Sequence, residues 1–151
     1  MPRTAKRSKQ HSLSSRTKFV RTIHELQKTV NKLACPSTED LTTIRAGLLK
    51  ISKHAPAAAI NDGWRLVKSR LISLARSQQL AVQSSVLQMP LLLASIMQAQ
   101  GILPEPEFRL LLRVRALLDE ALLQKQILPQ IAAALVDLNL GVSACCGMTM
   151  N

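Results

Sequence analysis

Apolar residues recur at helical spacing along most of the chain. The first stripe, with steps of four, three, four and three, predicts a helix over residues 15–33 and consists of Phe19, Ile23, Leu26, Val30 and Leu33. Cys35–Pro36 is expected to end this helix, and the Ser37-x-x-Asp40 pattern is expected to start a second one. The second stripe consists of Leu41, Ile44, Leu48 and Ile51, and Pro56 is expected to stop that helix.

Four further helices are expected downstream. An Asn61–Asp62 cap begins the third helix, whose apolar positions are Trp64, Val67, Leu71 and Leu74. The fourth covers residues 86–100, with Gly101 as a left-handed C-cap, and the fifth runs from about residue 105 to 125. The sixth begins near Pro129 and ends before Gly141, which leaves residues 142–151 without periodicity. Because strand-like alternation is missing and β-branched runs are short, we expect an all-α fold.

Three of the expected helices resemble one another. Residues 41–49, 89–97 and 128–136 align without gaps, at offsets of 48 and 39 residues. Each segment has a pair of small residues (Ala, Gly or Ser) at its centre. Periods in this range are typical of stacked helical hairpins. The pattern predicts antiparallel helical hairpins stacked as a short α-solenoid, and the alternative is an irregular bundle with ordinary core periodicity.

Charged residues are distributed unevenly along the chain. It carries 20 Lys and Arg against 9 Asp and Glu, a net charge of +11, although 47% of its 151 residues are hydrophobic. Residues 1–18 have no acid and almost nothing apolar, so this arm is expected to be disordered on its own. We therefore divide the chain into a basic arm (1–18), a helical domain (19–141) and an irregular tail (142–151).

The arm has three possible roles. It could thread among RNA phosphates and release counterions, act as an organellar transit peptide, or act as a nuclear or nucleolar signal. The first role would use its basic residues, which are Arg3, Lys6, Arg7, Lys9, Arg16 and Lys18.

Other basic residues lie off the apolar stripes. They are Arg21, Lys28 and Lys32 in the first helix and Arg65, Lys68, Arg70 and Arg76 in the third, with Arg109, Arg113 and Arg115 on the outer side of the fifth. The basic residues of the first and third helices are candidate RNA-binding residues, because phosphate contacts position RNA without reading its sequence. The alternative is that these are ordinary solvated faces.

The chain offers no pattern for catalysis, a cofactor or a metal. Nucleotide, hydrolase and zinc-protease motifs are absent from the sequence, and His11, His24 and His54 stand alone. The close carboxylate pairs fall at predicted helix starts or on polar faces, where they complement helix dipoles. We therefore assign no catalytic, cofactor-binding or metal residues and expect a protein that is not an enzyme and takes no small-molecule substrate.

Three further features narrow the function. With three cysteines, two of them adjacent at Cys145–Cys146, a disulfide framework is disfavoured and a reducing compartment is favoured. Only 2% of residues are aromatic, and Trp64 lies on an apolar stripe, so we interpret it as core rather than as a base-stacking platform. Residues 77–104 lack charge but contain many Gln and Ser and Pro90, so a membrane span is not expected.

Two segments suggest a family resemblance. Met89-Pro-Leu-Leu-Leu-Ala-Ser-Ile-Met-Gln-Ala-Gln-Gly101 and Leu128-Pro-Gln-Ile-Ala-Ala-Ala-Leu-Val-Asp-Leu-Asn-Leu-Gly141 resemble the first helices of α-hairpin repeats in organellar RNA-binding proteins. These are the octotricopeptide, heptatricopeptide and FAST-kinase-like proteins. The resemblance covers residues 41–141 and departs from that group in having only about two and a half repeats. It implies an organellar, RNA-associated role as a fixed component of a mitochondrial ribosome.

Together these observations predict a structural component of a ribonucleoprotein. It would bind rRNA or another structured RNA through the arm and the basic helix faces, beside neighbouring subunits of the particle. The resemblance implies a mitochondrial location, and a nucleolar or cytoplasmic ribonucleoprotein is the alternative. The alternative function is a helical adaptor of a large organellar protein complex without direct RNA contact.

Overall fold

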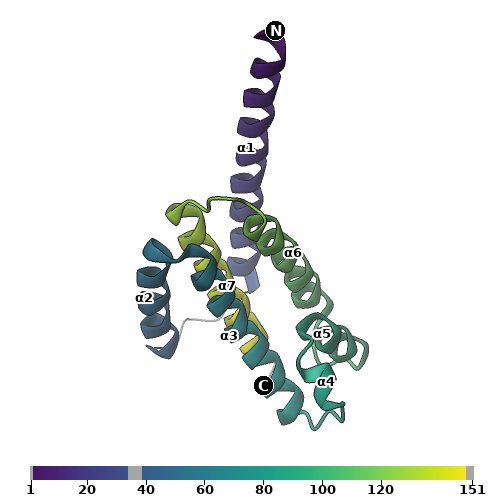
Figure 1. The fold of residues 1–151 in the computed structure, drawn as a ribbon. Helices are drawn as coiled ribbons and strands as arrows, with labels where there is room; N and C mark the ends of the chain where they lie inside the picture. The colour runs from purple at the N-terminus through teal and green to yellow at the C-terminus, as the bar shows by residue number, and fades with distance from the viewer. Residues whose placement is uncertain (1, 34–38, 149–151) are drawn as a thin grey trace.

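The fold is known from a computed structural model that describes residues 2–33 and 39–148. The side chains of residues 2–16, 39–40 and 146–148 lie outside that description. In the described residues there are helices and no strands, which confirms the all-α prediction. The helices are α1 (Pro2–Leu33), α2 (Glu39–His54), α3 (Pro56–Ser77), α4 (Ser84–Leu87), α5 (Pro90–Ala99), α6 (Glu105–Leu122) and α7 (Pro129–Met148) (Figure 1).

Helix α7 is the centre of the fold. It packs against α3, α1, α2 and α6, which surround it (Figure 1). Its sequence contains one charged residue, Asp137, and buried residues follow one another almost without interruption from Leu135 to Cys145. A helix that is apolar all round is stable only when it is covered on all sides. In a solenoid the last helix would contact only its neighbours in the chain, so this architecture is the irregular bundle.

The positions matched between the similar segments lie in different environments. Leu41 is buried in the structure, whereas its counterparts Met89 and Leu128 are exposed. Gly47, matched to the centre of the other segments, has no atom within 4 Å of where a Cβ would stand. The small residue there does not serve a close helix contact. The matched segments therefore share a Leu- and Ala-rich composition without sharing a packing arrangement.

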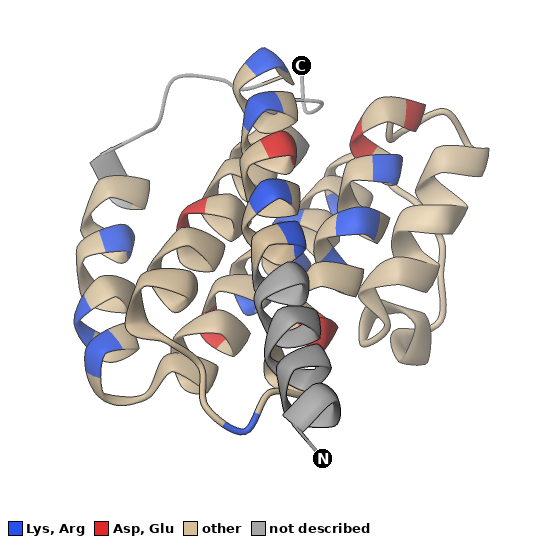
Figure 2. Cartoon of the chain, turned by 90° about the horizontal axis from the view of Figure 1, so that it is seen from above, with Lys and Arg blue, Asp and Glu red and all other residues tan. Residues whose placement is uncertain are grey.

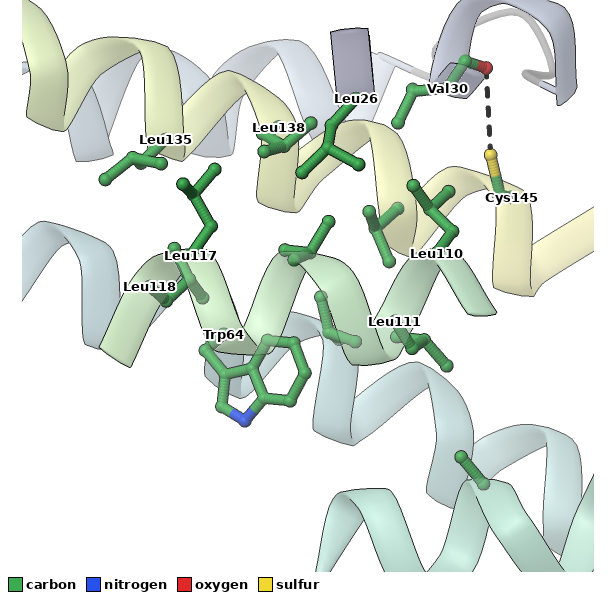
Figure 3. Close-up of a cluster of buried hydrophobic side chains, with 14 of the residues drawn as sticks. Leu26, Val30, Trp64, Leu110, Leu111, Leu117, Leu118, Leu135, Leu138 and Cys145 are labelled. Carbon is green, nitrogen blue, oxygen red and sulfur yellow. Dashed lines mark hydrogen bonds between the residues drawn. The ribbon is translucent and has the colours of Figure 1, made fainter. Parts of the chain in front are cut away.

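Two apolar clusters hold the helices together. The larger one joins α1, α3, α5, α6 and α7, and part of it is drawn in Figure 3. The first predicted stripe lies in it, since Phe19, Ile23, Leu26 and Val30 are buried. Burial of each such side chain contributes about 1.5–3 kcal/mol. A smaller cluster holds α2 against α3 and α7 through Leu41, Leu48, Ala59, Val136 and Leu140.

Trp64 belongs to the larger cluster, as predicted for a core residue. The guanidinium of Arg115 lies over its ring, 5.1 Å from the ring centroid, and also pairs with Asp119 one turn further along α6. Cation–π contacts of this kind contribute about 0.5–1 kcal/mol at exposed sites. Arg115 therefore holds α6 against α3 and is only partly exposed, in contrast to the outward position expected for it.

Helix α1 is longer than its apolar stripe. It begins at Pro2, although the sequence predicts a start near Ser15 and an irregular arm before it. Residues 3–16 contain neither Gly nor Pro, so a helix anchored by the stripe can extend through them at little cost. The cap predicted at Ser37 and the helix end at Cys35–Pro36 lie outside the described residues.

Prolines account for two further differences between the predicted and the observed helix boundaries. Helix α3 begins at Pro56, so Asn61–Asp62 lies inside the helix and is not its cap. The single helix expected over residues 86–100 is two, α4 and α5, because Pro90 lacks the N–H and its ring clashes with the preceding turn. Pro90 is instead the first residue of α5. Gly101 has a φ of 73°, as predicted for a left-handed C-cap, and α6 ends at Leu122 rather than near residue 125.

Helix α7 continues past Gly141 to Met148, where the sequence predicts a helix end and an irregular tail. At Gly141 the helix crosses α1 so closely that an added Cβ would overlap Cγ1 of Val30. Val142 and Cys145 beyond it are buried in the larger cluster, and Cys145 Sγ lies 3.9 Å from the carbonyl oxygen of Val30 (Figure 3). The glycine therefore marks a helix crossing.

The crossing makes a prediction about two glycines. Gly141→Ala should destabilise the fold by about 1–3 kcal/mol, because Val30 is stiff and cannot move away from the added methyl group. Gly47→Ala is the matched control: it lies in α2 with free space around it and should stabilise the fold by about 0.5–1 kcal/mol. Urea unfolding followed by circular dichroism measures both. Equal stabilisation by the two changes would contradict the crossing.

Candidate nucleic-acid interface

The basic residues of α1 whose side chains are described lie along one outer side of the helix. Lys18, Arg21, Lys28 and Lys32 are all exposed, and so is Glu25, which lies between Arg21 and Lys28 in the sequence. Figure 2 shows that blue, basic positions predominate along the described part of α1. Their spacing of three, seven and four residues places them on the side away from the buried stripe. We call these four residues the α1 stripe. The side chains of Arg3, Lys6, Arg7, Lys9 and Arg16, predicted to bind RNA as well, lie outside the described residues.

The α1 stripe adjoins two arginines of α6. Arg109 and Arg113 line a hollow of about 440 Å³ together with Thr29 of α1. Arg109 Nη2 contacts Glu105 Oε1 at 2.7 Å, but both side chains are mostly exposed, so water competes with this pair. Arg109 and Arg113 of α6 therefore lie beside α1, in a hollow whose lining also includes Glu105. The sequence predicted only that they lie on the outer side of their own helix.

A second basic region lies on α3. Arg65, Lys68 and Arg76 line a hollow of about 360 Å³, and its other lining residues are Ser69, Ile72, Ser73 and Gln88. Six of these seven residues come from one side of α3, at steps of three and one, and Gln88 directly follows α4. We call this the α3 hollow. Because its lining contains no carboxylate, it presents only positive charge and neutral hydrogen-bonding groups.

Hydrogen bonds fix parts of the α3 hollow. Lys68 Nζ donates to Gln88 Oε1 at 2.7 Å, which ties the lysine to the residue after α4. Arg65 Nη1 lies 3.5 Å from Asp62 Oδ1, one turn earlier on α3 and outside the lining. That pair is exposed and long, so it leaves Arg65 available to another anion.

The four basic residues predicted on α3 do not act as one set. Arg70 does not line the hollow, because its position is five residues from Arg65 and falls on another side of the helix. The polar residues Ser69, Ser73 and Gln88 were not predicted. Ser69 and Ser73 share the helical spacing of Arg65 and Arg76, so the sequence did hold a pattern that could have found them. Gln88 could not be found this way, because its place depends on how α4 folds back.

The two basic regions are separate. Helices α1 and α3 each pack on α7 rather than mainly on each other, and α6 lies beside α1. A nucleic acid that covers the α1 stripe therefore does not have to cover the α3 hollow. Each region can be altered by substitution while the other is left intact.

A groove of different character lies between α1 and α2. Its floor is α7, and its volume is about 480 Å³. Ile23, Leu41 and Leu140 supply apolar lining, while Arg45 and Asp137 form an ion pair at its rim, with Nε 2.6 Å from Oδ1. Asp137 raises the pKa of Arg45, chiefly through this hydrogen bond and to a lesser extent through the negative charge of its carboxylate.

The described side chains form no metal-binding group and no membrane-spanning helix. Within the described part of the chain, no group of three or more His, Cys, Asp or Glu side chains is placed to hold a metal ion. None of the described helices is long and apolar enough to cross a membrane. Cys145 is buried, and the side chains of Cys35 and Cys146 lie outside the described residues.

The Arg45–Asp137 pair should contribute little to stability. In a double-mutant cycle with Arg45→Met and Asp137→Asn, we expect a coupling free energy of at most about 1 kcal/mol, because both side chains are partly exposed. The coupling should shrink in 1 M NaCl, where the Debye length is about 3 Å. Urea unfolding of the four proteins measures it. A coupling that stays the same in high salt would show that the pair is shielded from solvent.

Comparison with known proteins adds no assignment to this geometry. No family model, curated protein or solved structure matches the chain. Its function is therefore argued from its own surface. That surface carries two basic regions, the α1 stripe with the α6 arginines and the α3 hollow.

Proposed function

We propose that this protein is an RNA-associated structural component of a ribonucleoprotein, and that it holds rRNA through its basic arm and basic helix faces. The observation that carries the proposal is the convergence of Arg65, Lys68 and Arg76 on one hollow without a carboxylate in its lining. The mitochondrial ribosome is the particle implied by the family resemblance.

The charge of the chain supports contact with a polyanion. The whole chain carries a net charge of +11, with six of its positive charges in the arm, and binding of phosphates would relieve the repulsion among these charges. None of the seven basic residues that belong to the α1 stripe and the α3 hollow is buried. These charges are therefore free of the core and available for phosphates.

The aromatic residues favour binding through the RNA backbone. Phe19 and Trp64 are buried and Phe108 is half-buried, so none presents an open ring on which a base could stack. Phosphate contacts hold a nucleic acid in position without reading its sequence. The proposed role is accordingly architectural, with affinity set by salt and by the shape of the RNA.

The second candidate function, a helical adaptor, is favoured by the face of α5. Met89 and Leu92 are exposed within residues 77–104, a segment without a charged residue. Methionine and a lack of charge are typical of the centres of protein interfaces. A subunit of a ribonucleoprotein also has protein neighbours, so this face alone does not separate the two functions.

A salt titration of RNA binding separates them. The purified protein is titrated into a fluorescently labelled RNA stem-loop at several NaCl concentrations, and fluorescence anisotropy gives the affinity. We expect the logarithm of the affinity to fall linearly with the logarithm of salt, by about 0.7–0.9 for each phosphate neutralised. Absence of binding at low salt would reject the RNA function in favour of the adaptor. Sedimentation with mitochondrial ribosomal particles after a high-salt wash tests the particle itself.

Two pairs of lysines test the α1 stripe. Lys28→Gln with Lys32→Gln removes two charges from the stripe and should reduce the salt slope by about 1.5, since two phosphate contacts are lost. Lys50→Gln with Lys53→Gln removes two exposed charges from α2 and is the matched control, expected to leave the slope nearly unchanged. If both variants behave alike, net charge alone governs binding and the stripe is not a contact surface.

Removal of residues 1–16 tests the arm. The truncation deletes five of the predicted RNA-binding residues and keeps Phe19, the first buried residue of α1. The helical core should therefore unfold at an unchanged urea concentration, while RNA affinity and the salt slope both fall. An unchanged slope would show that the arm does not contact RNA.

A further inference from the structure

We infer that the α3 hollow is a track for the sugar–phosphate backbone of a single RNA strand, with Gln88 as the residue that positions Lys68. The inference rests on the proposed function and deepens it, because it assigns one strand and one kind of contact to one site. It concerns the side of α3 lined by Arg65, Lys68, Ser69, Ile72, Ser73, Arg76 and the facing Gln88.

The length of the hollow favours a strand over an isolated phosphate. Arg65 and Arg76 stand at its two ends, about 16 Å apart along the axis of α3 at a rise of 1.5 Å per residue. Lys68 lies between them, nearer to Arg65. One phosphate group cannot reach cations over such a length. A strand can do so, because it carries a phosphate at each nucleotide.

Gln88 gives Lys68 a defined place in this track. A flexible lysine side chain loses conformational entropy when it binds, and the 2.7 Å bond to Gln88 Oε1 has already restricted it. An ammonium group has three N–H donors, so two remain for phosphate oxygens while one stays on Gln88. The pre-positioned lysine therefore needs less ordering when RNA arrives.

The serines supply neutral contacts between the cations. Ser69 and Ser73 lie one turn apart on the lined side of α3, and both are exposed. Hydroxyl groups are common donors to phosphate oxygens in nucleic-acid complexes. Ile72, half-buried between them, leaves room for the backbone without offering a polar group of its own. Along α3 the two hydroxyl groups thus lie between Lys68 and Arg76.

The electrostatics favour an anion in this place. Arg65 and Lys68 lie three residues apart on one side of a helix, where like charges destabilise each other. Arg65 pairs with Asp62 at 3.5 Å, and Lys68 donates a hydrogen bond to the neutral side chain of Gln88. Phosphates in the hollow would neutralise all three cations, so binding and relief of repulsion occur together.

Two arginines of the same helix make the test. The probe is a labelled single-stranded oligouridylate, which has no base pairing, and fluorescence anisotropy is measured at several salt concentrations. Arg76→Gln should weaken binding several-fold and reduce the salt slope by about 0.7, the value for one phosphate of a single strand. Arg70→Gln removes the same charge from a position outside the hollow and should change neither quantity. Gln88→Leu keeps the net charge and should weaken binding with little change in slope.

Chemical protection of Lys68 gives a second, local readout. The protein is acetylated with an amine-reactive ester, with and without oligouridylate, and each lysine is quantified by mass spectrometry. Lys68 should be protected by the RNA, while Lys50 and Lys53 of α2 serve as internal controls and should react as before. Urea unfolding of each variant shows whether the fold is kept.

The outcomes separate this inference from the proposed function. The track is overturned if Arg76→Gln and Arg70→Gln have equal effects and Lys68 is not protected. If the salt dependence is still steep in that case, RNA binding belongs to the α1 stripe. Absence of oligouridylate binding at low salt would overturn the track, and absence of stem-loop binding as well would overturn both. If polyglutamate protects Lys68 as well as the RNA does at equal charge, the site belongs to an acidic polypeptide and the track is rejected.

Discussion

The burial of α7 is the constraint on which the rest of the structure depends. This helix has one charged residue, and its polar Asn139 and Ser143 are buried with the apolar residues. Asn139 donates from Nδ2 to the carbonyl oxygen of Ile60 at 3.2 Å, beside Gly63 of α3. Such a helix must be surrounded, and α1, α2, α3 and α6 surround it. The basic residues consequently gather on the outer sides of the surrounding helices, where they form the α1 stripe and the α3 hollow.

Amphipathic helices were predictable, and the central helix was not. The stripe from Phe19 to Val30 is buried as expected, because a helix with one covered side shows its period in the sequence. Helix α7 is covered on several sides, so its residues 142–148 show no period although they are helical. The helix end predicted before Gly141 was wrong for a related reason. In a sequence, a glycine at a helix end looks the same as a glycine at a helix crossing, and here only the structure shows that Val30 packs against it.

In the candidate site, too, residues of one helix could be predicted from the sequence, whereas a residue brought in from another part of the chain could not. The sequence grouped Arg65, Lys68, Arg70 and Arg76 because no acid lies among them, and helical spacing alone would have separated Arg70 from the rest. Gln88 is twenty residues from Lys68 and meets it only because Pro90 ends one helix and begins another. Contacts that depend on such a turn cannot be predicted from the local spacing of apolar and polar residues. RNA binding itself stays a proposal carried by charge and geometry.

The place of α7 in the order of the chain has a consequence for how the protein is made. The helix on which α1, α2, α3 and α6 all pack is synthesised after all four of them. During translation, the apolar sides of the earlier helices face solvent without their common partner, and the contact between α1 and α7 closes a loop of more than a hundred residues. The core therefore assembles only after translation of α7. Contacts between residues so far apart in the chain form more slowly than the local contacts within each helix.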